Sequence, residues 1–388
     1  MKGDLASRLA VLEHEGLARR TLPVGSAVGP VVKVCGRDVI NLSSNDYLGL
    51  AAHPALAAAS RAAADSLGTG AAASRLVTGT MDVHEDLERE IASFLGAERA
   101  LLFGSGYLAN LGALASLGAE GGTILSDERC HASIVDACRL AKAKIRIYRH
   151  LDVSHVREIL SRMHQDGRPA IVVTESVFSM DGDRGPVRAI CDAAARHSAW
   201  VYVDEAHGFG ILGPGGRGLA AEAGGGVHAV MGTLGKALGS YGAFVAGSAE
   251  LVDYLTSTAR TFFYSTALPP TVVASSRAAL AIVSGPEGAT LRARLGRNVE
   301  FLRGGLAAQG WRLGEVPGPI LPVIVPGAGR AVRLADGLLE RGVLVRAMRF
   351  PTVARGTERL RIVVSASHTE DHLREALGAF GEALREAT

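Results

Sequence analysis

The sequence predicts an α/β protein whose large domain holds a mainly parallel sheet of seven strands. From residue 100 onward, short apolar runs alternate with helical stretches, and strands that alternate with helices are joined by right-handed crossovers. Such crossovers produce a parallel sheet that helices cover on both faces. The chain has 388 residues, 48% of them hydrophobic, which is enough for one large domain and a smaller one. The expected strands are 100–103, 123–125, 145–148, 170–174, 200–203, 229–231 and 243–246.

Residues 1–45 are expected to form an N-terminal segment ahead of the large domain. The leucines at positions 5, 9, 12 and 17 fall near one face, which predicts an amphipathic helix. A hairpin follows, because the apolar residues 31–34 and 39–42 flank the turn residues Gly36-Arg37-Asp38.

Residues 46–285 are expected to form the large domain, and residues 286–388 a small C-terminal α+β domain. The large domain begins with an alanine-rich helix from Pro54 and continues with a helix that has an apolar stripe. That stripe consists of Leu87, Ile91 and Phe94 or Leu95. The small domain is expected to close, with the N-terminal segment, over the cleft of the large domain. Its predicted elements are strands 343–347 and 360–364 and helices near 331–341 and 371–387.

The composition favours a cytoplasmic protein that binds neither nucleic acid nor a membrane. The 41 Lys and Arg residues nearly balance the 39 Asp and Glu residues without a basic block or an acidic tail, so neither nucleic acid nor a membrane is an expected partner. The four cysteines form no CxxC pair and lack metal-ligand spacing, which indicates reduced thiols and no metal site. Residues 1–20 are not expected to form a signal peptide, and the uncharged stretch 101–119 is interpreted as a strand, a turn and a helix.

The candidate functional residues follow the ends of the predicted strands. Ligands of parallel sheets bind beyond the carboxyl ends of the strands, so side chains from successive strand ends are expected to converge there. The glycine-rich turn before the first helix of the sheet region could hold a phosphate on free backbone N–H groups. The candidates, in chain order, are Gly106, Tyr107, His131, Ser179, Asp204, His207, Thr233 and Lys236.

Lys236 lies among glycines and small residues in the stretch Gly232-Thr-Leu-Gly-Lys-Ala-Leu-Gly239. Loss of hydration in such a setting favours the neutral amine, the nucleophile of a Schiff-base lysine. Pyridoxal 5′-phosphate (PLP) requires a lysine for its aldehyde, a carboxylate for its ring nitrogen and a helix end for its phosphate. Lys236, Asp204 and the turn at Gly106 satisfy these requirements, so the residues predict a PLP site.

A nicotinamide-dependent oxidoreductase is the rival interpretation. Gly104-x-Gly106-x-x-Ala109 follows a strand, and Asp127 lies 21 residues beyond Gly106, as in a dinucleotide-binding fingerprint. However, about a hundred residues precede this motif, and it gives no role to Lys236 or Asp204.

Several motifs resemble those of the α-oxoamine synthases, which are fold-type I PLP-dependent transferases, over nearly the whole chain and in the same order. The motifs are Asn45-Asp-Tyr-Leu-Gly49, Val177-Phe-Ser-Met-Asp-Gly182, Val203-Asp-Glu-Ala-His-Gly208, Gly232–Gly239 and Tyr264-Ser-Thr-Ala-Leu-Pro-Pro270. Family members condense an amino acid with an acyl thioester and release carbon dioxide. The resemblance is strongest to the member that joins L-alanine to a pimeloyl thioester in biotin biosynthesis.

The resemblance implies a role for each candidate. Lys236 is the Schiff-base lysine and the base for the α-proton, Asp204 pairs with the ring nitrogen, and His131 stacks on the ring. Ser179 and His207 form hydrogen bonds near the cofactor's phenolic oxygen. Gly106 and Tyr107 hold its phosphate, with Thr233 nearby, and Thr266 of the partner subunit in a homodimer reaches the same phosphate. Arg361 holds the amino acid carboxylate, and Arg20, Arg349 and Thr352 lie along the path of the acyl thioester.

The substrate is left partly open by the sequence. Gly356-Thr-Glu-Arg-Leu-Arg361 is shared with 5-aminolevulinate synthase, and Phe350 replaces a proline that is usual in the biotin-pathway member. A glycine C-acetyltransferase or a 5-aminolevulinate synthase are therefore alternatives within the family. Neither the choice between coenzyme A and acyl carrier protein as acyl donor, nor the strictness for acyl length, follows from the sequence.

Overall fold

The computed structural model describes residues 4–119, 121–163, 169–314 and 318–387, which form two compact units. Unit 1 comprises Met1–Gly49, Met180–Asp183 and Ala293–Thr388, and unit 2 comprises Leu50–Ser179 and Arg184–Arg292. The domain limits expected from the sequence are at residues 45/46 and 285/286. These limits stay a prediction. No described helix has the length and apolar character needed to cross a membrane.

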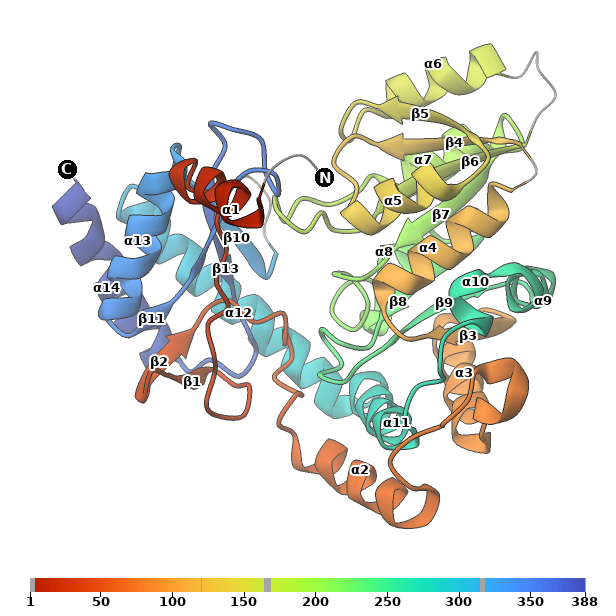
Figure 1. The fold of residues 1–388 in the computed structure, drawn as a ribbon, viewed down its shortest axis with the longest axis horizontal. Helices are drawn as coiled ribbons and strands as arrows, with labels where there is room; N and C mark the ends of the chain where they lie inside the picture. The colour runs from red at the N-terminus through yellow and green to blue at the C-terminus, as the bar shows by residue number, and fades with distance from the viewer. Residues whose placement is uncertain (1–3, 120, 164–168, 315–317, 388) are drawn as a thin grey trace. The chain divides into compact units, whose positions relative to one another are not determined.

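Unit 2 is built on a seven-stranded sheet in the order β3-β9-β8-β7-β6-β4-β5 (Figure 1). All seven strands predicted from the alternation of apolar and helical segments are confirmed. Their bounds are β3 Arg99–Phe103, β4 Thr123–Asp127, β5 Lys144–Tyr148, β6 Ala170–Glu175, β7 Trp200–Asp204, β8 Ala229–Thr233 and β9 Ala243–Gly247. Strands β4 to β8 pair in parallel, whereas β9 runs antiparallel to both β8 and β3, so the prediction of a mainly parallel sheet is also confirmed.

Alternate residues of the strands enter two separate cores, one on each face of the sheet. Ile171 and Val173 join the core that contains helices α4, α5, α9 and α10, while Ala170 and Val172 join the core that contains α6, α7 and α8. Successive side chains of a strand point to opposite faces, which explains why the strands are apolar throughout. The helices are α4 Gly106–Leu117, α5 Ala132–Leu140, α6 Val153–Met163, α7 Val187–Ala195, α8 Leu219–Glu222, α9 Ala249–Thr258 and α10 Arg260–Phe263.

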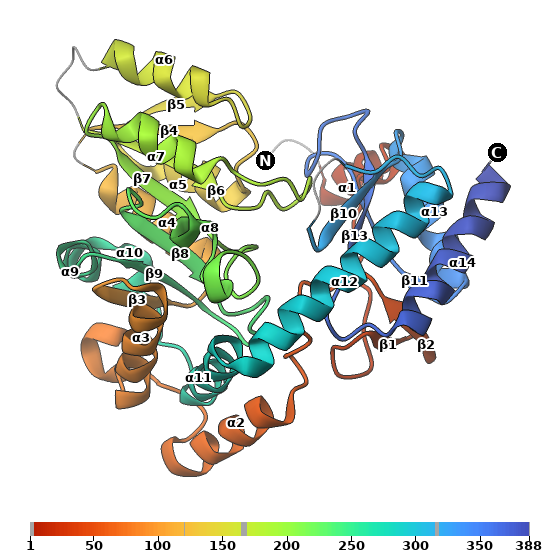
Figure 2. The same cartoon turned by 180° about the vertical axis from the view of Figure 1, so that it is seen from behind.

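Three further helices of unit 2 pack together beside the sheet (Figures 1 and 2). They are α2 Pro54–Leu67, α3 Asp82–Leu95 and α11 Pro270–Ser284. Proline at the first position of α2 and α11 fits the start of a helix, where an N–H has no internal partner. Leu87 and Ile91 of α3 are fully buried, as the apolar stripe predicts. The short helix η1, Arg75–Gly79, precedes α3.

Unit 1 contains two three-stranded sheets, β1-β2-β11 and β10-β13-β12. The predicted hairpin is confirmed as the antiparallel pair β1 and β2. The strands are β1 Val31–Val34, β2 Arg37–Asn41, β10 Ile320–Ile324, β11 Val343–Leu344, β12 Arg346–Met348 and β13 Arg359–Val363, and the helices are α1 Leu5–His14, α13 Ala328–Glu340 and α14 Glu370–Ala387. Helix α12, Pro286–Ala308, includes residues of both units.

Helix α1 differs from its prediction in one respect. It ends at His14, so Leu17 lies beyond it, and none of its residues is buried within the described chain. The amphipathic spacing was therefore a correct signal for the helix, but the expected leucine face covers no core in unit 1.

We predict that Arg75→Met destabilises unit 2 by about 3 kcal/mol, because it leaves a buried carboxylate without its cation. Arg75 donates two hydrogen bonds to Glu88, at 2.8 and 3.0 Å, and the two side chains are 7% and 13% exposed. The measurement is the free energy of unfolding in urea, followed by circular dichroism. The control is Arg162→Met, which removes an exposed pair with Glu158 and should cost less than about 1 kcal/mol. Equal losses in the two variants would contradict the prediction.

Candidate active site

The candidate side chains of unit 2 come from neighbouring strands at one edge of its sheet. Asp204 is the last residue of β7, and the adjacent strand β8 leads into Thr233 and Lys236. His131 caps α5 after β4, and Ser179 lies on a turn after β6. Because these strands are parallel, their carboxyl ends deliver the side chains to the same edge.

Lys236 is half-buried and lies beside His207. Its Nζ is 2.8 Å from Nε2 of His207, which is itself buried in the turn after β7. An amine and an imidazole at this distance share a hydrogen bond, so one of the two nitrogens acts as acceptor. The pair therefore places a group that can exchange protons next to the lysine.

The Asp204 carboxylate is buried and held from two sides. One oxygen accepts a hydrogen bond from the Ala206 backbone N–H at 2.8 Å, and the other accepts one from Asn110 Nδ2 at 2.8 Å. Tyr202 in turn donates to the Asn110 side-chain oxygen at 2.8 Å. Asn110 and Tyr202 were not among the candidates; a lone buried amide in a helix of leucine and alanine was the signal that could have identified Asn110.

His131 is exposed at the N-terminus of α5, with its ring orientation fixed by Ser133. Nδ1 of His131 accepts a hydrogen bond from the Ser133 backbone N–H at 3.2 Å. Partial desolvation lowers the pKa of His131, the Asp204 carboxylate opposes this shift, and the Lys236 ammonium contributes to it. The ring is therefore neutral at pH 7, as a group that stacks on a pyridine ring should be.

Glu175, the last residue of β6, contacts the backbone of His131 and was also absent from the candidates. Its carboxyl accepts a hydrogen bond from the His131 backbone N–H. Burial raises the pKa of Glu175 well above its usual value, and the neighbouring Asp204 carboxylate adds to the shift. Two adjacent buried carboxyls do not both ionise readily, so burial and the neighbouring Asp204 favour the protonated form of Glu175.

The N-terminus of α4 has two free donors for an anion. Among the first N–H groups, that of Leu108 bonds to Ser105 Oγ at 3.3 Å and that of Ala109 bonds to the Ser105 carbonyl. The N–H groups of Gly106 and Tyr107 have no such partner among the described residues. A Cβ built on Gly106 would lie 4.0 Å from the Thr233 Cβ, so this helix end and the end of β8 are neighbours.

Three candidates occupy less central positions. Tyr107 is 42% exposed, and its hydroxyl donates to Asp136. Ser179 is half-buried on its turn. Thr266 is exposed, and its backbone forms a bridge with Ser74 beside η1. The structure thus brings Lys236, His207, Asp204 and His131 together in one cluster, and it leaves Thr266 at the surface of unit 2.

These residues fit PLP. A lysine amine, a buried carboxylate held by two hydrogen bonds, a neutral imidazole and unpartnered N–H groups at a helix end are the four features that its aldehyde, ring nitrogen, ring face and phosphate require. The fit rests on the hydrogen bonds that hold Asp204 and on the two free donors of α4.

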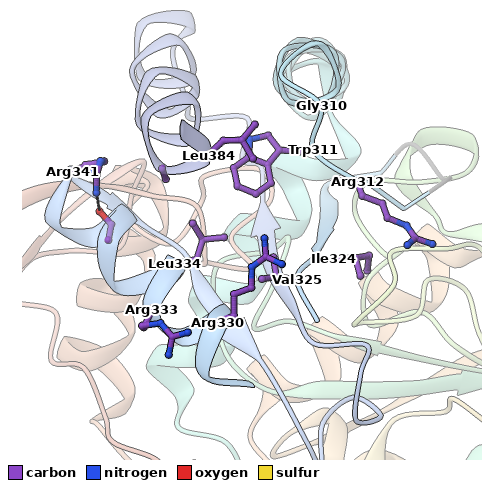
Figure 3. Close-up of a pocket in the computed structure, with 12 residues that line it drawn as sticks. Gly310, Trp311, Arg312, Ile324, Val325, Arg330, Arg333, Leu334, Arg341 and Leu384 are labelled. Atoms are coloured by element: carbon purple, nitrogen blue, oxygen red, sulfur yellow. Dashed lines mark hydrogen bonds between the residues drawn. The ribbon is translucent and has the colours of Figure 1, made fainter. Parts of the chain in front are cut away.

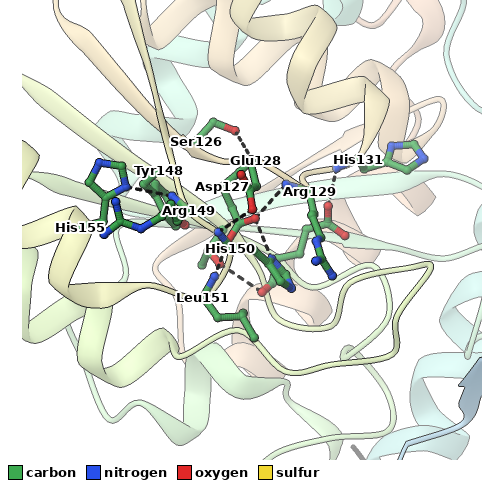
Figure 4. A network of polar contacts seen from close by, with 12 residues as sticks. Ser126, Asp127, Glu128, Arg129, His131, Tyr148, Arg149, His150, Leu151 and His155 are labelled. Carbon is green, nitrogen blue, oxygen red and sulfur yellow. Dashed lines mark hydrogen bonds and ion pairs between the residues drawn. The ribbon is translucent and has the colours of Figure 1, made fainter. Parts of the chain in front are cut away.

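The nicotinamide interpretation is wrong for this fold. A dinucleotide-binding unit needs adjacent parallel strands, whereas β3 and β4 lie at opposite sides of the sheet, separated by β9, β8, β7 and β6. Asp127 is also engaged (Figure 4): it accepts hydrogen bonds from the backbone N–H groups of Arg129 and Leu151, each at 2.9 Å, and pairs with His150 Nδ1 at 2.8 Å. Its carboxylate anchors two loops and is not available to a ribose.

In unit 1, Arg361 is buried on β13 and held by the Asn45-Asp-Tyr-Leu-Gly49 motif. Arg361 donates to the Asn45 side-chain oxygen at 3.1 Å, and the Tyr47 hydroxyl donates to the same oxygen at 3.2 Å. Burial raises the pKa of Tyr47 to about 12, although the Arg361 guanidinium opposes the shift. Tyr47 therefore stays protonated, and this motif positions a guanidinium in a fixed direction.

Arg20, Arg349 and Thr352 line a single cavity of about 640 Å³ in unit 1. Arg19 and Arg346 line it as well. The aliphatic part of the lining includes Leu22, Leu339 and Leu344. Arg19 donates to the Thr352 hydroxyl at 3.0 Å, and Arg349 donates to the Ala18 carbonyl. The three residues, far apart in the sequence, thus share a pocket with positive charge and apolar surface. We call it the thioester cavity below.

The sequence is similar to a known family and to enzymes that share one name. Residues 37–380 match the family model described as aminotransferase class I and II. The 8-amino-7-oxononanoate synthase of Anaeromyxobacter dehalogenans is 45% identical over 382 residues, which cover 98% of this chain and 95% of the relative. The enzyme of the same name from Geobacter sulfurreducens is 43% identical over 388 residues, covering 100% and 99% of the two chains.

Solved structures show the same fold. The serine palmitoyltransferase of Sphingomonas wittichii has a TM-score of 0.92 at 33% identity, covering 98% of this chain and 96% of that one. The 8-amino-7-oxononanoate synthase of Francisella tularensis has a TM-score of 0.76 at 29% identity, covering 90% and 98%. The fold-type I assignment made from the sequence motifs is thereby confirmed.

Beside Asp204, the carboxyl of Glu205 occupies a closed space between glycines. It accepts a hydrogen bond from the Ala220 N–H at 2.6 Å, and a Cβ on Gly208 would lie 2.2 Å from its Oε2. Burial raises the pKa of Glu205 from its ordinary 4.5 to about 7. Glu205 is thus a second buried acid of the same motif, directed away from the lysine cluster.

We predict that Glu205→Gln reduces the loss of stability between pH 5 and pH 7. Above pH 4.5 the unfolded chain releases the Glu205 proton while the folded chain keeps it up to about pH 7, so the wild-type free energy of unfolding falls with pH, by at most about 3 kcal/mol. The glutamine has no proton to lose. Urea unfolding at pH 5, 6 and 7 measures the slope, with the exposed Glu158→Gln as control. Equal slopes for wild type and Glu205→Gln would contradict the assignment.

Proposed function

The chain belongs to the class I and II aminotransferase family, and from that premise we propose that it is a PLP-dependent 8-amino-7-oxononanoate synthase. The enzyme condenses L-alanine with a pimeloyl thioester and releases carbon dioxide and the free thiol, a step of biotin biosynthesis. The single observation that carries the proposal is full-length identity of 43–50% to proteins of that name. The cluster of Lys236, Asp204 and His131 supplies the chemistry that this name requires.

The cofactor would be held by the side chains already described in unit 2. Lys236 would bond its aldehyde, Asp204 its protonated ring nitrogen, and the N–H groups of Gly106 and Tyr107 its phosphate. Bound in this way, PLP withdraws electrons from the substrate and stabilises negative charge on the α-carbon. Asn110 and Tyr202 keep the Asp204 carboxylate directed at one point, which is the role of supporting residues around a preorganised site.

Lys236 is the group best placed to remove the α-proton of alanine. Its Nζ lies 2.8 Å from His207 Nε2, which provides a partner that can stabilise either protonation state of the amine. The neutral ring of His131 would cover the face of the cofactor ring without adding positive charge there. Ser179 and His207 would contact the phenolic oxygen of the cofactor, as the resemblance to the family implies.

Arg361 would bind the carboxylate of alanine. A guanidinium binds a carboxylate through two parallel hydrogen bonds, which fixes the direction of the bond that breaks when carbon dioxide leaves. Asn45 takes one N–H of Arg361 at 3.1 Å and thereby orients the rest of the fork. Arg361 would therefore determine both how tightly alanine binds and how its carboxylate is oriented.

The thioester cavity would receive the acyl donor. Its guanidiniums, on Arg20 and Arg349 among others, suit the phosphates of coenzyme A or of a phosphopantetheine arm, and its aliphatic wall suits an acyl chain. Thr352 adds a hydroxyl that Arg19 orients. The cytoplasm, which contains these donors, is the expected location.

We also propose a homodimer in which Thr266 of one protomer reaches the cofactor phosphate of the other. Thr266 lies at the surface of unit 2 beside η1, where Leu76 and Val77 are 56% and 74% exposed, and Tyr264 is 70% exposed. Large apolar side chains grouped at a surface are typical of a subunit interface.

Serine palmitoyltransferase activity is the second candidate, because its structures superpose with TM-scores up to 0.93 against 0.76 for the Francisella synthase. However, its identity of 31–33% is well below the 43–50% of the synthases. The TM-score compares backbones, which the family shares, whereas substrate choice depends on side chains. The glycine C-acetyltransferase and 5-aminolevulinate synthase alternatives stay predictions that the same assay tests.

The proposal predicts that thiol is released with L-alanine and pimeloyl thioester at least tenfold faster than with other pairs. The assay follows thiol release with alanine, glycine or serine against pimeloyl, succinyl, acetyl and palmitoyl thioesters. Pimeloyl-CoA and pimeloyl-acyl carrier protein are compared as donors. Faster release with serine and palmitoyl-CoA, or with glycine and a short acyl group, would replace the synthase assignment by another family activity.

Lys236→Ala should abolish exchange of the alanine α-proton in deuterated water, measured by NMR, since no other amine in the cluster can take the proton. The wild-type protein should be yellow, and borohydride should fix the chromophore to Lys236 alone. The control is Arg303→Ala, which removes a positively charged side chain from α12 and should leave the exchange intact. Retained exchange in Lys236→Ala would assign the base to another residue.

Val77→Asp should convert the dimer into monomers, because a carboxylate would be buried at the interface without a partner. Light scattering after size exclusion measures the mass of each variant. The control is Leu140→Asp on α5, which is 65% exposed and distant in sequence from η1. If both Val77→Asp and Leu140→Asp remain dimers, the interface does not include the surface around η1.

A further inference from the structure

A second large groove in unit 1 has no role in the function proposed above. Its cavity measures about 530 Å³ and lies among α13, α14 and the segment that follows α12 (Figure 3). It shares no lining residue with the thioester cavity, and Arg361 does not line it. We call it the arginine groove and define it by Trp311, Arg312, Arg330, Arg333, Leu334 and Leu384.

The charge of the arginine groove is strongly positive. Arg312, Arg330 and Arg333 are exposed along it, and no carboxylate of the described ranges forms an ion pair with any of them. Arg341, which also lines the cavity, differs in that it pairs with Glu382 at 3.4 Å. Three cations gathered around one depression repel one another, and a bound anion would relieve this repulsion.

Carboxylates nearby are engaged in other contacts. Glu358, which directly precedes β13, accepts hydrogen bonds from the backbone N–H groups of Gly327 and Gly356 at 2.9 and 3.0 Å. These N–H groups lower the pKa of Glu358, the bond from Gly327 being the largest cause, so this carboxylate is held by the backbone on either side of it. It leaves the guanidiniums of Arg330 and Arg333 available.

The floor of the groove is apolar and contains a buried donor. Trp311 packs edge-on against Phe380, with ring centroids 5.6 Å apart, and Leu334 and Leu384 lie on either side of it in Figure 3. The indole Nε1 of Trp311 is buried, and no acceptor among the described residues bonds to it. A buried N–H without an acceptor destabilises a fold, and native structures rarely retain one without a reason.

We propose that the arginine groove is a binding site for an amphipathic organic anion, a hydrocarbon chain or ring that bears a carboxylate or a phosphate. The anionic group would bind the guanidiniums of Arg330 and Arg333, and the hydrocarbon part would cover Trp311, Leu334 and Leu384. A volume of about 530 Å³ suits an organic ligand and far exceeds that of an inorganic ion. The inference does not depend on the proposed synthase activity.

The chain offers a direct reporter for this site. It has two tryptophans, and Trp200 lies in unit 2, so Trp200→Phe leaves Trp311 as the only indole. Titration of this variant with octanoate, and separately with octyl phosphate, should shift its fluorescence saturably. The ligand with the lower dissociation constant identifies whether the natural group is a carboxylate or a phosphate ester, and inorganic phosphate alone should give no shift.

Arg330→Gln with Arg333→Gln, introduced into the same variant, should weaken binding at least tenfold. The matched control is Arg294→Gln with Arg297→Gln, which removes the same charge from two exposed positions of α12 and should leave the dissociation constant within twofold. Circular dichroism of each variant verifies its fold. Absence of a saturable shift, equal weakening in the control, or weakening by Arg349→Gln in place of the groove pair would overturn the proposal.

Discussion

The hydrogen bonds that hold the Asp204 carboxylate are the interaction on which the site depends. A carboxylate buried at the end of a central strand is unfavourable unless donors surround it. Asn110 and the Ala206 N–H provide those donors, and burial raises the pKa of Glu175, which disfavours a second negative charge beside Asp204. The ionised group can then bind a protonated ring nitrogen, so the same contacts that make the buried charge tolerable also make it functional.

The two units carry different ionisable groups. Unit 2 places an amine, a carboxylate and an imidazole on neighbouring strand ends, where the rigid parallel ladder sets their separation. Unit 1 places guanidiniums: Arg361 on a strand, and Arg20 and Arg349 in a cavity. In the proposed reaction, the groups of unit 2 would hold the cofactor, which acts as the electron sink, and the guanidiniums of unit 1 would bind the carboxylate and phosphate groups of the substrates.

The sequence predicted the seven-stranded sheet well because apolar runs and helical stretches alternate without interruption. It could not predict that β9 runs antiparallel, since an apolar five-residue strand carries no mark of its direction. Asn110 was missed because its helix reads as uniformly apolar, and its partner Asp204 is 94 positions away. The arrangement on β13 was equally hidden: Arg359 and Arg361 share a face, yet Arg359 bonds to Asp181 and Arg361 to Asn45.

The motif Asp204-Glu-Ala-His-Gly208 shows why adjacent acids take opposite roles. Asp204 completes β7 and faces the lysine cluster, whereas the chain turns at Glu205 and directs that carboxyl into a space bounded by Gly208 and Gly218. A Cβ on Gly218 would lie 2.4 Å from the Glu205 carboxyl carbon, and its φ of +90° favours glycine independently. Glu205 fixes the turn, and the turn carries His207 to within 2.8 Å of Lys236. These glycines are therefore required for the position of the histidine.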